Sequence, residues 1–134
     1  MEKITMHVTV TPIFAALLGL IFVFLSIRTV NARRKAQVSL GDGGDEPLQK
    51  AIRAHANFIE YVPITLLMML FLEMRAVSIY VIIVLGVLLF VGRCLHAVGV
   101  SRTPPNFQFR KIGMVFTFLA LLIASLWLLY TYLI

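Results

Sequence analysis

Cysteine and acidic side chains are scarce in this chain of 134 residues. Cys94 is the single cysteine, so the chain can form no internal disulfide and no cysteine-based metal site. Aspartate and glutamate together number 6, against 12 lysines and arginines, which gives a formal net charge of +6. The 3 histidines are scattered, without carboxylates at metal-ligand or catalytic-triad spacing. The sequence therefore predicts neither a metal centre nor a Ser–His–Asp hydrolase.

Charged residues are also few, at 13% of the chain, whereas 60% of the residues are hydrophobic, well above the share in an ordinary soluble domain. The apolar residues gather in four runs, at roughly 10–27, 58–72, 76–91 and 113–134. A membrane span needs about 20 residues, so the two middle runs must extend into their polar flanks. We expect an all-α integral membrane protein, a four-transmembrane-helix bundle in a single domain over residues 1–134. Its helices are expected at about 9–37, 47–73, 76–100 and 108–134.

Glycine and proline mark the ends of these helices. Gly41-Asp42-Gly43-Gly44 cannot sustain a helix and predicts the one substantial loop. Asp45 is a suitable N-cap for the second helix, with Pro47 in its first turn, where a missing N–H does no harm. Pro63 lies inside that helix and should bend it. Pro104-Pro105 breaks the chain before the fourth helix.

Basic residues concentrate around the first and third connections between the predicted helices: Arg28, Arg33, Arg34, Lys35, Lys50, Arg93, Arg102, Arg110 and Lys111. By the positive-inside bias, these connections face the cytoplasm and both termini lie on the opposite side. The aromatic residues Tyr80, Trp127, Tyr130 and Tyr132 would then form a belt at the non-cytoplasmic interface. Because the positive charge follows a membrane interface, we expect the membrane as a partner and no nucleic acid.

Polar side chains also cluster where the second helix enters apolar sequence. Arg53, Asn57 and Glu60 are spaced i, i+4, i+7, which places them on one helix face. Ionisable groups at membrane depth cost about 2.5 kcal/mol or more, so they should face a partner or a wet cavity. Arg93 and His96 add to the set from the third helix, and Glu60 is the single acid expected on this face. Since arginine's planar fork binds carboxylate or phosphate, the set predicts a small anionic or zwitterionic ligand.

An alternative is that the basic residues extend to lipid headgroups and set the topology. That explanation suffices for four residues, Arg28, Lys35, Arg102 and Lys111. It explains less well the four polar residues next to or within the apolar runs, Arg53, Asn57, Glu60 and Arg93. His55 lies about 160° away from the Arg53–Glu60 face at 100° per residue and should serve a different helix contact. For His96, a ligand contact and a hydrogen bond between helices both remain open.

Three motifs in this order resemble the MAPEG superfamily, the membrane-associated proteins in eicosanoid and glutathione metabolism. The strongest is Arg53-x-His-x-Asn57-x-x-Glu60-Tyr61-x-Pro63, which is similar to the family's second-helix pattern Arg-x-x-x-Asn-x-x-Glu-(Tyr)-x-Pro. Asn-Ala-Arg33-Arg34 resembles the end of the first helix in leukotriene synthase. Gly92-Arg93-Cys-Leu-His96-Ala-Val-Gly99 resembles the third-helix motif of prostaglandin E synthase. The resemblance covers nearly the whole chain, and the glycine-rich loop looks closest to a bacterial branch, which implies the bacterial inner membrane.

The resemblance implies a homotrimer of four-helix subunits, with glutathione as co-substrate between neighbouring subunits near the cytoplasmic face. Carried over by position, the glutathione-binding residues would be Arg33 (from the adjacent subunit), Arg53, Asn57, Glu60, Tyr61, Arg93 and His96. In the family, an arginine at the start of the fourth helix stabilises the thiolate. Arg110 is the candidate for that catalytic role, with Arg102 as the alternative. The family's tyrosine seven residues after the third-helix arginine is here Val100.

The implied function is that of a microsomal glutathione transferase, a glutathione peroxidase, or both, acting on lipophilic electrophiles or lipids from the membrane. Val100 leaves open a second function, a non-catalytic membrane scaffold that binds lipid or glutathione. A third is a small proton-coupled multidrug exporter in which Glu60 carries the proton. An exporter of cations has little use for a ring of arginines.

Overall fold

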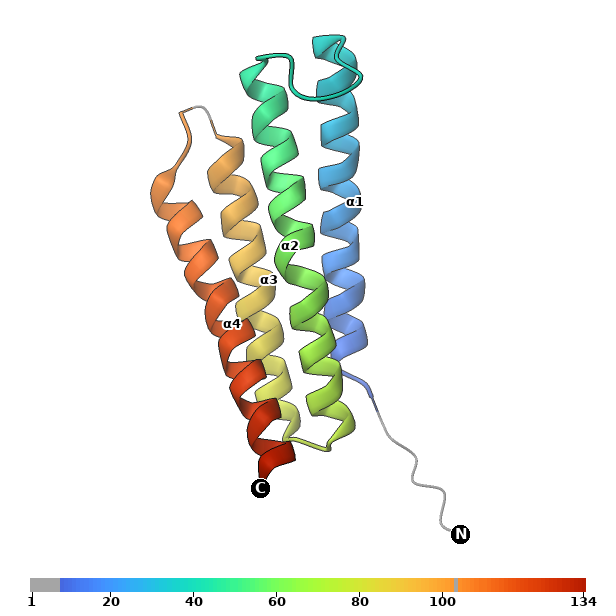
Figure 1. Cartoon of the computed structure of the whole chain (residues 1–134), viewed down its shortest axis with the longest axis vertical. Helices are drawn as coiled ribbons and strands as arrows, with labels where there is room; N and C mark the ends of the chain where they lie inside the picture. The colour runs from blue at the N-terminus through green and yellow to red at the C-terminus, as the bar shows by residue number, and fades with distance from the viewer. Residues whose placement is uncertain (1–7, 103) are drawn as a thin grey trace.

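The computed structural model describes residues 8–102 and 104–134, and this part of the chain contains four helices. They are α1 (Thr11–Ala36), α2 (Glu46–Met74), α3 (Ile79–Ser101) and α4 (Phe107–Leu133). The helices run alongside one another as an elongated bundle (Figure 1). Each is long and apolar enough to cross a membrane, which confirms the expected all-α bundle with four spans. Their ends lie within a few residues of the predicted bounds.

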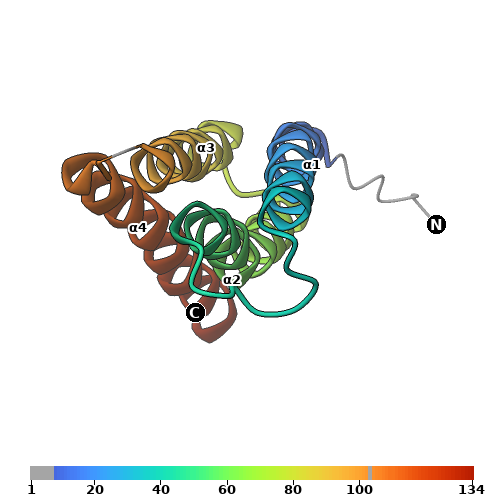
Figure 2. The same ribbon diagram turned by 90° about the horizontal axis from the view of Figure 1, so that it is seen from above.

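Helix α2 packs against all three other helices, and the α3–α4 contact is the most extensive in the bundle. Seen from above, α1 and α4 lie at opposite sides, with α2 and α3 between them (Figure 2). At the end of the bundle that carries the α1–α2 loop, α1 and α2 extend further than α3 and α4 (Figure 1). At this end, α3 ends part of the way along α1 and α2, and α4 begins there (Figure 1).

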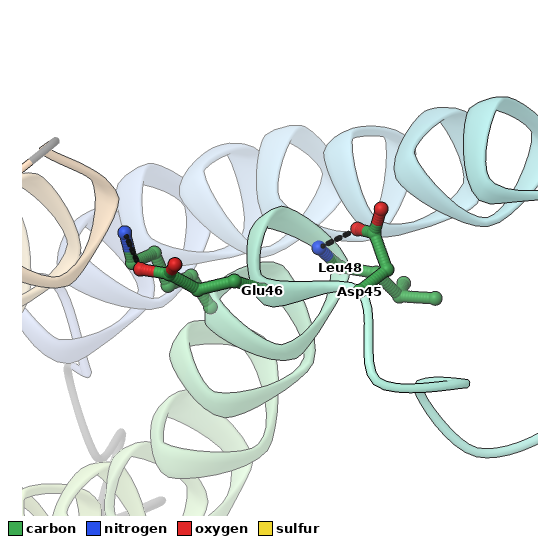
Figure 3. Close-up of polar contacts among 4 residues, drawn as sticks. Asp45, Glu46 and Leu48 are labelled. Atoms are coloured by element: carbon green, nitrogen blue, oxygen red, sulfur yellow. Dashed lines mark hydrogen bonds and ion pairs between the residues drawn. The ribbon is translucent and has the colours of Figure 1, made fainter.

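The glycine-rich segment forms the predicted loop between α1 and α2. Gly41, Gly43 and Gly44 have φ of 71°, 57° and 77°, a region that residues with a side chain rarely adopt. The Asp45 carboxylate accepts a hydrogen bond from the backbone N–H of Leu48 at 2.8 Å (Figure 3). This confirms the predicted N-cap, which satisfies one of the free N–H groups of the first turn of α2.

At the opposite end of the bundle, Glu73 caps a helix distant in sequence. Its carboxylate accepts hydrogen bonds from the backbone N–H groups of Thr9 at 2.6 Å, Val10 at 2.7 Å and Thr11 at 2.8 Å. These groups belong to the start of α1, where Val10 provides no side-chain cap of its own. A carboxylate at this position both satisfies free N–H groups and interacts favourably with the helix dipole.

Arg75, two residues further on, binds the last turn of α4. Its guanidinium donates to the backbone oxygen of Thr131 at 2.8 Å and lies over the Tyr132 ring, 4.8 Å from the ring centroid. A cation at the C-terminal end of a helix again matches the sign of the dipole. The short α2–α3 link thus holds the beginning of α1 and the end of α4.

Two glycines allow α3 and α4 to approach closely. A Cβ added at Gly113 would lie 2.6 Å from the Gly92 carbonyl oxygen and 2.6 Å from the His96 backbone nitrogen. Close backbone approach through small residues is common between helices in membranes, because packing rather than water exclusion holds them together. The contact sets the polar residues of α3 directly against α4.

Candidate anion-binding site

The centre of the site is Arg93 on α3, whose side chain is 1% exposed. One terminal guanidinium nitrogen donates to the Asn57 side-chain oxygen at 2.7 Å and lies 3.2 Å from Nδ1 of His96. The other donates to the Thr117 hydroxyl at 3.5 Å. Nε has no partner among the described residues. A buried charge is usually paired with an opposite one, whereas these partners are neutral. Among the described residues, no carboxylate lies within 4.0 Å of this buried guanidinium.

Asn57 links this arginine to Glu60. Its side-chain oxygen accepts from Arg93, and its Nδ2 donates to a Glu60 carboxylate oxygen at 3.4 Å. Glu60 is exposed on α2, so its carboxylate remains accessible from outside the subunit. The structure thus brings together four of the residues predicted for the site, Asn57, Glu60, Arg93 and His96.

A cavity of about 320 Å³ lies toward the α1–α2 loop end of α2, α3 and α4. Its lining consists of Glu46, Gln49, Lys50, Arg53, Val100, Pro105 and Arg110. The expectation that Glu60 would be the single acid on this face was wrong, because Glu46 also lines the cavity. Its carboxylate pairs with Lys50 at 2.6 Å (Figure 3). Within the described ranges, neither Arg53 nor Arg110 has a carboxylate within 4.0 Å, so the cavity is positively charged.

The cavity and the Arg93 cluster occupy successive levels of the same helices. On α2, Arg53 precedes Asn57 by four residues. On α3, Val100 follows His96 by four residues. Four residues of α-helix rise about 6 Å, so the cavity lies about one turn from the hydrogen-bonded cluster. An anion in the cavity would therefore be close to the buried guanidinium as well as to those that line it.

Arg110 and Arg102 occupy different places. Arg110 shares the cavity with Arg53. Arg102 lies on other cavities, and its guanidinium is 5.2 Å from the centroid of the Phe109 ring. Of the two candidates for thiolate stabilisation, Arg110 is thus the one placed beside the other site residues.

Arg33 stands apart from the cluster within one subunit, and among the described residues Tyr61 makes no hydrogen bond to the cluster. The Arg33 guanidinium donates to the Gly41 backbone oxygen at 2.7 Å and so lies against the α1–α2 loop. The Tyr61 ring packs edge-on against Phe118, with centroids 5.3 Å apart. The Arg33 position is compatible with a contribution to a neighbouring subunit, which stays a prediction.

Sequence reasoning missed Thr117 and Phe58 as parts of the site. The Phe58 ring centroid lies 5.7 Å from the central carbon of the Arg93 guanidinium. Thr117 carries a hydroxyl group within an apolar run, which could have indicated a polar contact inside the bundle. The expectation for His55 was correct, because it contacts α1 through Ser26, with 3.1 Å between Nε2 and the hydroxyl oxygen.

Comparison with known proteins gives a family and close relatives. The family model described as "MAPEG family" matches residues 11–130. The chain is 37% identical over 121 residues to "Inner membrane protein YecN" of Escherichia coli strain K12, covering 88% of this chain and 91% of the relative. The protein of the same name from E. coli O6:H1 matches equally well. No solved structure matches the chain. With four candidate spans, these relatives confirm a multi-pass membrane protein.

Proposed function

Because this chain belongs to the MAPEG family, we propose that it is a trimeric glutathione-binding protein of the bacterial inner membrane. We further propose that it acts as a glutathione transferase, a glutathione peroxidase, or both, on lipophilic electrophiles. The observation that carries this proposal is the buried Arg93 with neutral partners, next to a cavity lined by Arg53 and Arg110. Glutathione has two carboxylates for such arginines and one ammonium for Glu60.

The proposed conjugation step uses these residues. Glutathione is held by Arg53, Asn57, Glu60 and Arg93, with its thiol near Arg110. The guanidinium lowers the pKa of the thiol by stabilising the thiolate, and the proton leaves to solvent. The thiolate then attacks an aromatic carbon of a substrate from the lipid, so that a carbon–sulfur bond forms and a halide departs with its electron pair.

The direct test is a glutathione titration by calorimetry on the purified protein, with a thiolate absorbance difference spectrum from the same sample. Binding together with thiolate absorbance supports the proposal. Absence of glutathione binding in protein that is folded and membrane-inserted would contradict it.

Glu60→Gln should weaken glutathione binding by about ten- to a hundredfold. A charge-assisted contact contributes about 1.5–3 kcal/mol, which corresponds to that range of affinity. Glu60→Asp keeps the charge and is the control for the shape of the side chain. Unchanged affinity in Glu60→Gln would mean that the carboxylate does not hold the ligand ammonium.

We expect the detergent-solubilised protein to have the mass of a homotrimer. The cavity of about 320 Å³ is at the lower end of the about 300–1,000 Å³ typical of ligand pockets, and Glu60 faces outward. A neighbouring subunit that contributes Arg33 would complete the site. Light scattering that gives a monomer or a dimer would count against this arrangement, and a dimer would favour an exporter.

A non-catalytic scaffold is the second candidate, and Val100 favours it. This side chain lines the cavity with Arg53 and Arg110, so it offers a methyl group where the family has a tyrosine hydroxyl. A wild-type protein that binds glutathione but shows neither thiolate absorbance nor turnover would establish the scaffold. An exporter fits less well, because the arginines around the cavity would repel a cationic drug.

A further inference from the structure

A second cavity of about 330 Å³ lies between α1 and α3, on the side of the bundle away from the α2–α4 contact. It is lined by Phe24, Leu25, Arg28, Ala97, Val98, Ser101 and Arg102. It shares no lining residue with the cavity that contains Arg53 and Arg110. It is therefore a separate site, and nothing in the proposed glutathione chemistry uses it.

Among the described residues that line this cavity, two are arginines at its polar end and none is acidic. Arg28 is half-buried and donates to the Ser101 hydroxyl, which in turn donates to the Ala97 backbone oxygen. Arg102 is exposed beside them. Within residues 8–102 and 104–134, neither guanidinium has a carboxylate within 4.0 Å. Sequence reasoning assigned Arg28 to the lipid headgroups alone, but the side chain lies between two helices. Two positive charges around one cavity favour the binding of an anion there.

The rest of the cavity is apolar and opens sideways. Phe24 and Val98 are 65% and 44% exposed, and both belong to helices long and apolar enough to span a membrane. Leu25 is buried behind them. A small free anion would leave the apolar side chains of the cavity uncovered. An amphiphile would bury them under its hydrocarbon chain, which is favourable.

The position of the site along the bundle also favours an amphiphile. Ser101 is the last residue of α3, and the α3–α4 connection lies below the ends of α1 and α2 (Figure 1). Arg28 contacts α3 where that helix ends, at the boundary between apolar helix and polar connection. Phospholipid phosphates lie at this boundary, and a guanidinium can bind two phosphate oxygens at once.

We propose that the α1–α3 cavity is a binding site for an anionic phospholipid. Arg28 and Arg102 bind the phosphate, Ser101 contributes its hydroxyl, and an acyl chain lies along Phe24 and Val98. The lipid thereby joins α1 to α3, a pair of helices with few direct contacts of their own.

The test is lipid binding by the purified full-length protein in a neutral detergent, followed by native mass spectrometry and by thermal unfolding. Dioctanoyl phosphatidylglycerol should bind and raise the melting temperature, and phosphatidylcholine of the same chain length should bind about tenfold more weakly. Arg28→Gln should lose about tenfold in phosphatidylglycerol affinity, whereas Arg28→Lys should lose less. Lys35→Ala removes the same charge from an exposed position at the same end and should leave binding unchanged.

Three results would overturn the proposal. If the wild-type protein binds the two lipids equally well, the anionic headgroup plays no part in binding. This comparison does not depend on the folding of any variant. Equal protection by glycerol 3-phosphate would assign the site to a free phosphate. Equal loss in Lys35→Ala and Arg28→Gln would reduce the effect to surface charge. Arg28→Gln should retain glutathione binding, so failure here leaves the proposed function untouched.

Discussion

Arg110→Ala should lower the conjugation rate with a reactive aromatic electrophile by about a hundred- to a thousandfold, as expected when one preorganised electrostatic donor is removed. The glutathione affinity should stay within a few fold. Arg110 and Arg53 both line the cavity, and under the proposed function we expect Arg53, Glu60 and Arg93 to hold the ligand without requiring an ionised thiol. The measurement is turnover beside the thiolate absorbance difference, which should disappear while calorimetry still detects binding.

Lys111→Ala is the matched control, because it removes a neighbouring positive charge from an exposed position. It should leave both turnover and thiolate absorbance unchanged. If Arg102→Ala removes the thiolate absorbance and Arg110→Ala does not, the assignment of the catalytic arginine is wrong. Loss of glutathione affinity in Arg110→Ala would instead make this residue part of the binding site.

Gly113→Leu should strongly destabilise the protein and abolish glutathione binding together. A side chain at this position meets the Gly92 carbonyl and the His96 backbone, neither of which can rotate away. Overpacking costs about 1–3 kcal/mol, and here α3 must move away from α4. Because Arg93 donates to Thr117 across this contact, the movement breaks the buried cluster. The measurement is the melting temperature in detergent, beside the glutathione titration.

Gly19→Leu is the control for replacing a glycine within a membrane helix. A Cβ at Gly19 meets no heavy atom within 4 Å, and the residue is exposed on α1. This variant should keep its melting temperature and its ligand, since leucine also has the higher helix propensity. Similar losses in both variants would mean that the α3–α4 approach is not the cause.

The helices and their connections were predictable because their causes are local. Four apolar runs, the two middle ones extended into their polar flanks, give four helices long enough to span a bilayer, and glycines with positive φ give the loop. The spacing of Asn57 and Glu60 predicted their shared face, because helical periodicity fixes it. His55 was separated from that face by the same periodicity.

The contacts between distant segments were not predictable from one sequence. Glu73 and Arg75 read as polar residues of a turn, and nothing near them indicates that they bind other helices. The partner of Arg28 is likewise 73 residues away. Such pairs depend on the rotation and the axial shift of each helix relative to its neighbours. The sequence constrains these two quantities only weakly, because apolar residues occur both on the packed faces and on the faces exposed to lipid. Glu46 is a different case, because it lies seven residues before Arg53 and helical periodicity alone places both on one face of α2.

The capping of α1 by Glu73 has a consequence for the order in which the protein is made. The ribosome completes α1 before it reaches Glu73, which follows the capped residues by 62 to 64 positions. Until then the first N–H groups of α1 lack the carboxylate that accepts from them in the folded bundle, although each unsatisfied group is costly at the edge of the hydrocarbon. The earliest helix is thus secured only when the α2–α3 hairpin has been inserted, and Arg75 secures the last turn of α4 later still. We therefore expect the bundle to close at this end only after the middle of the chain has been inserted into the membrane.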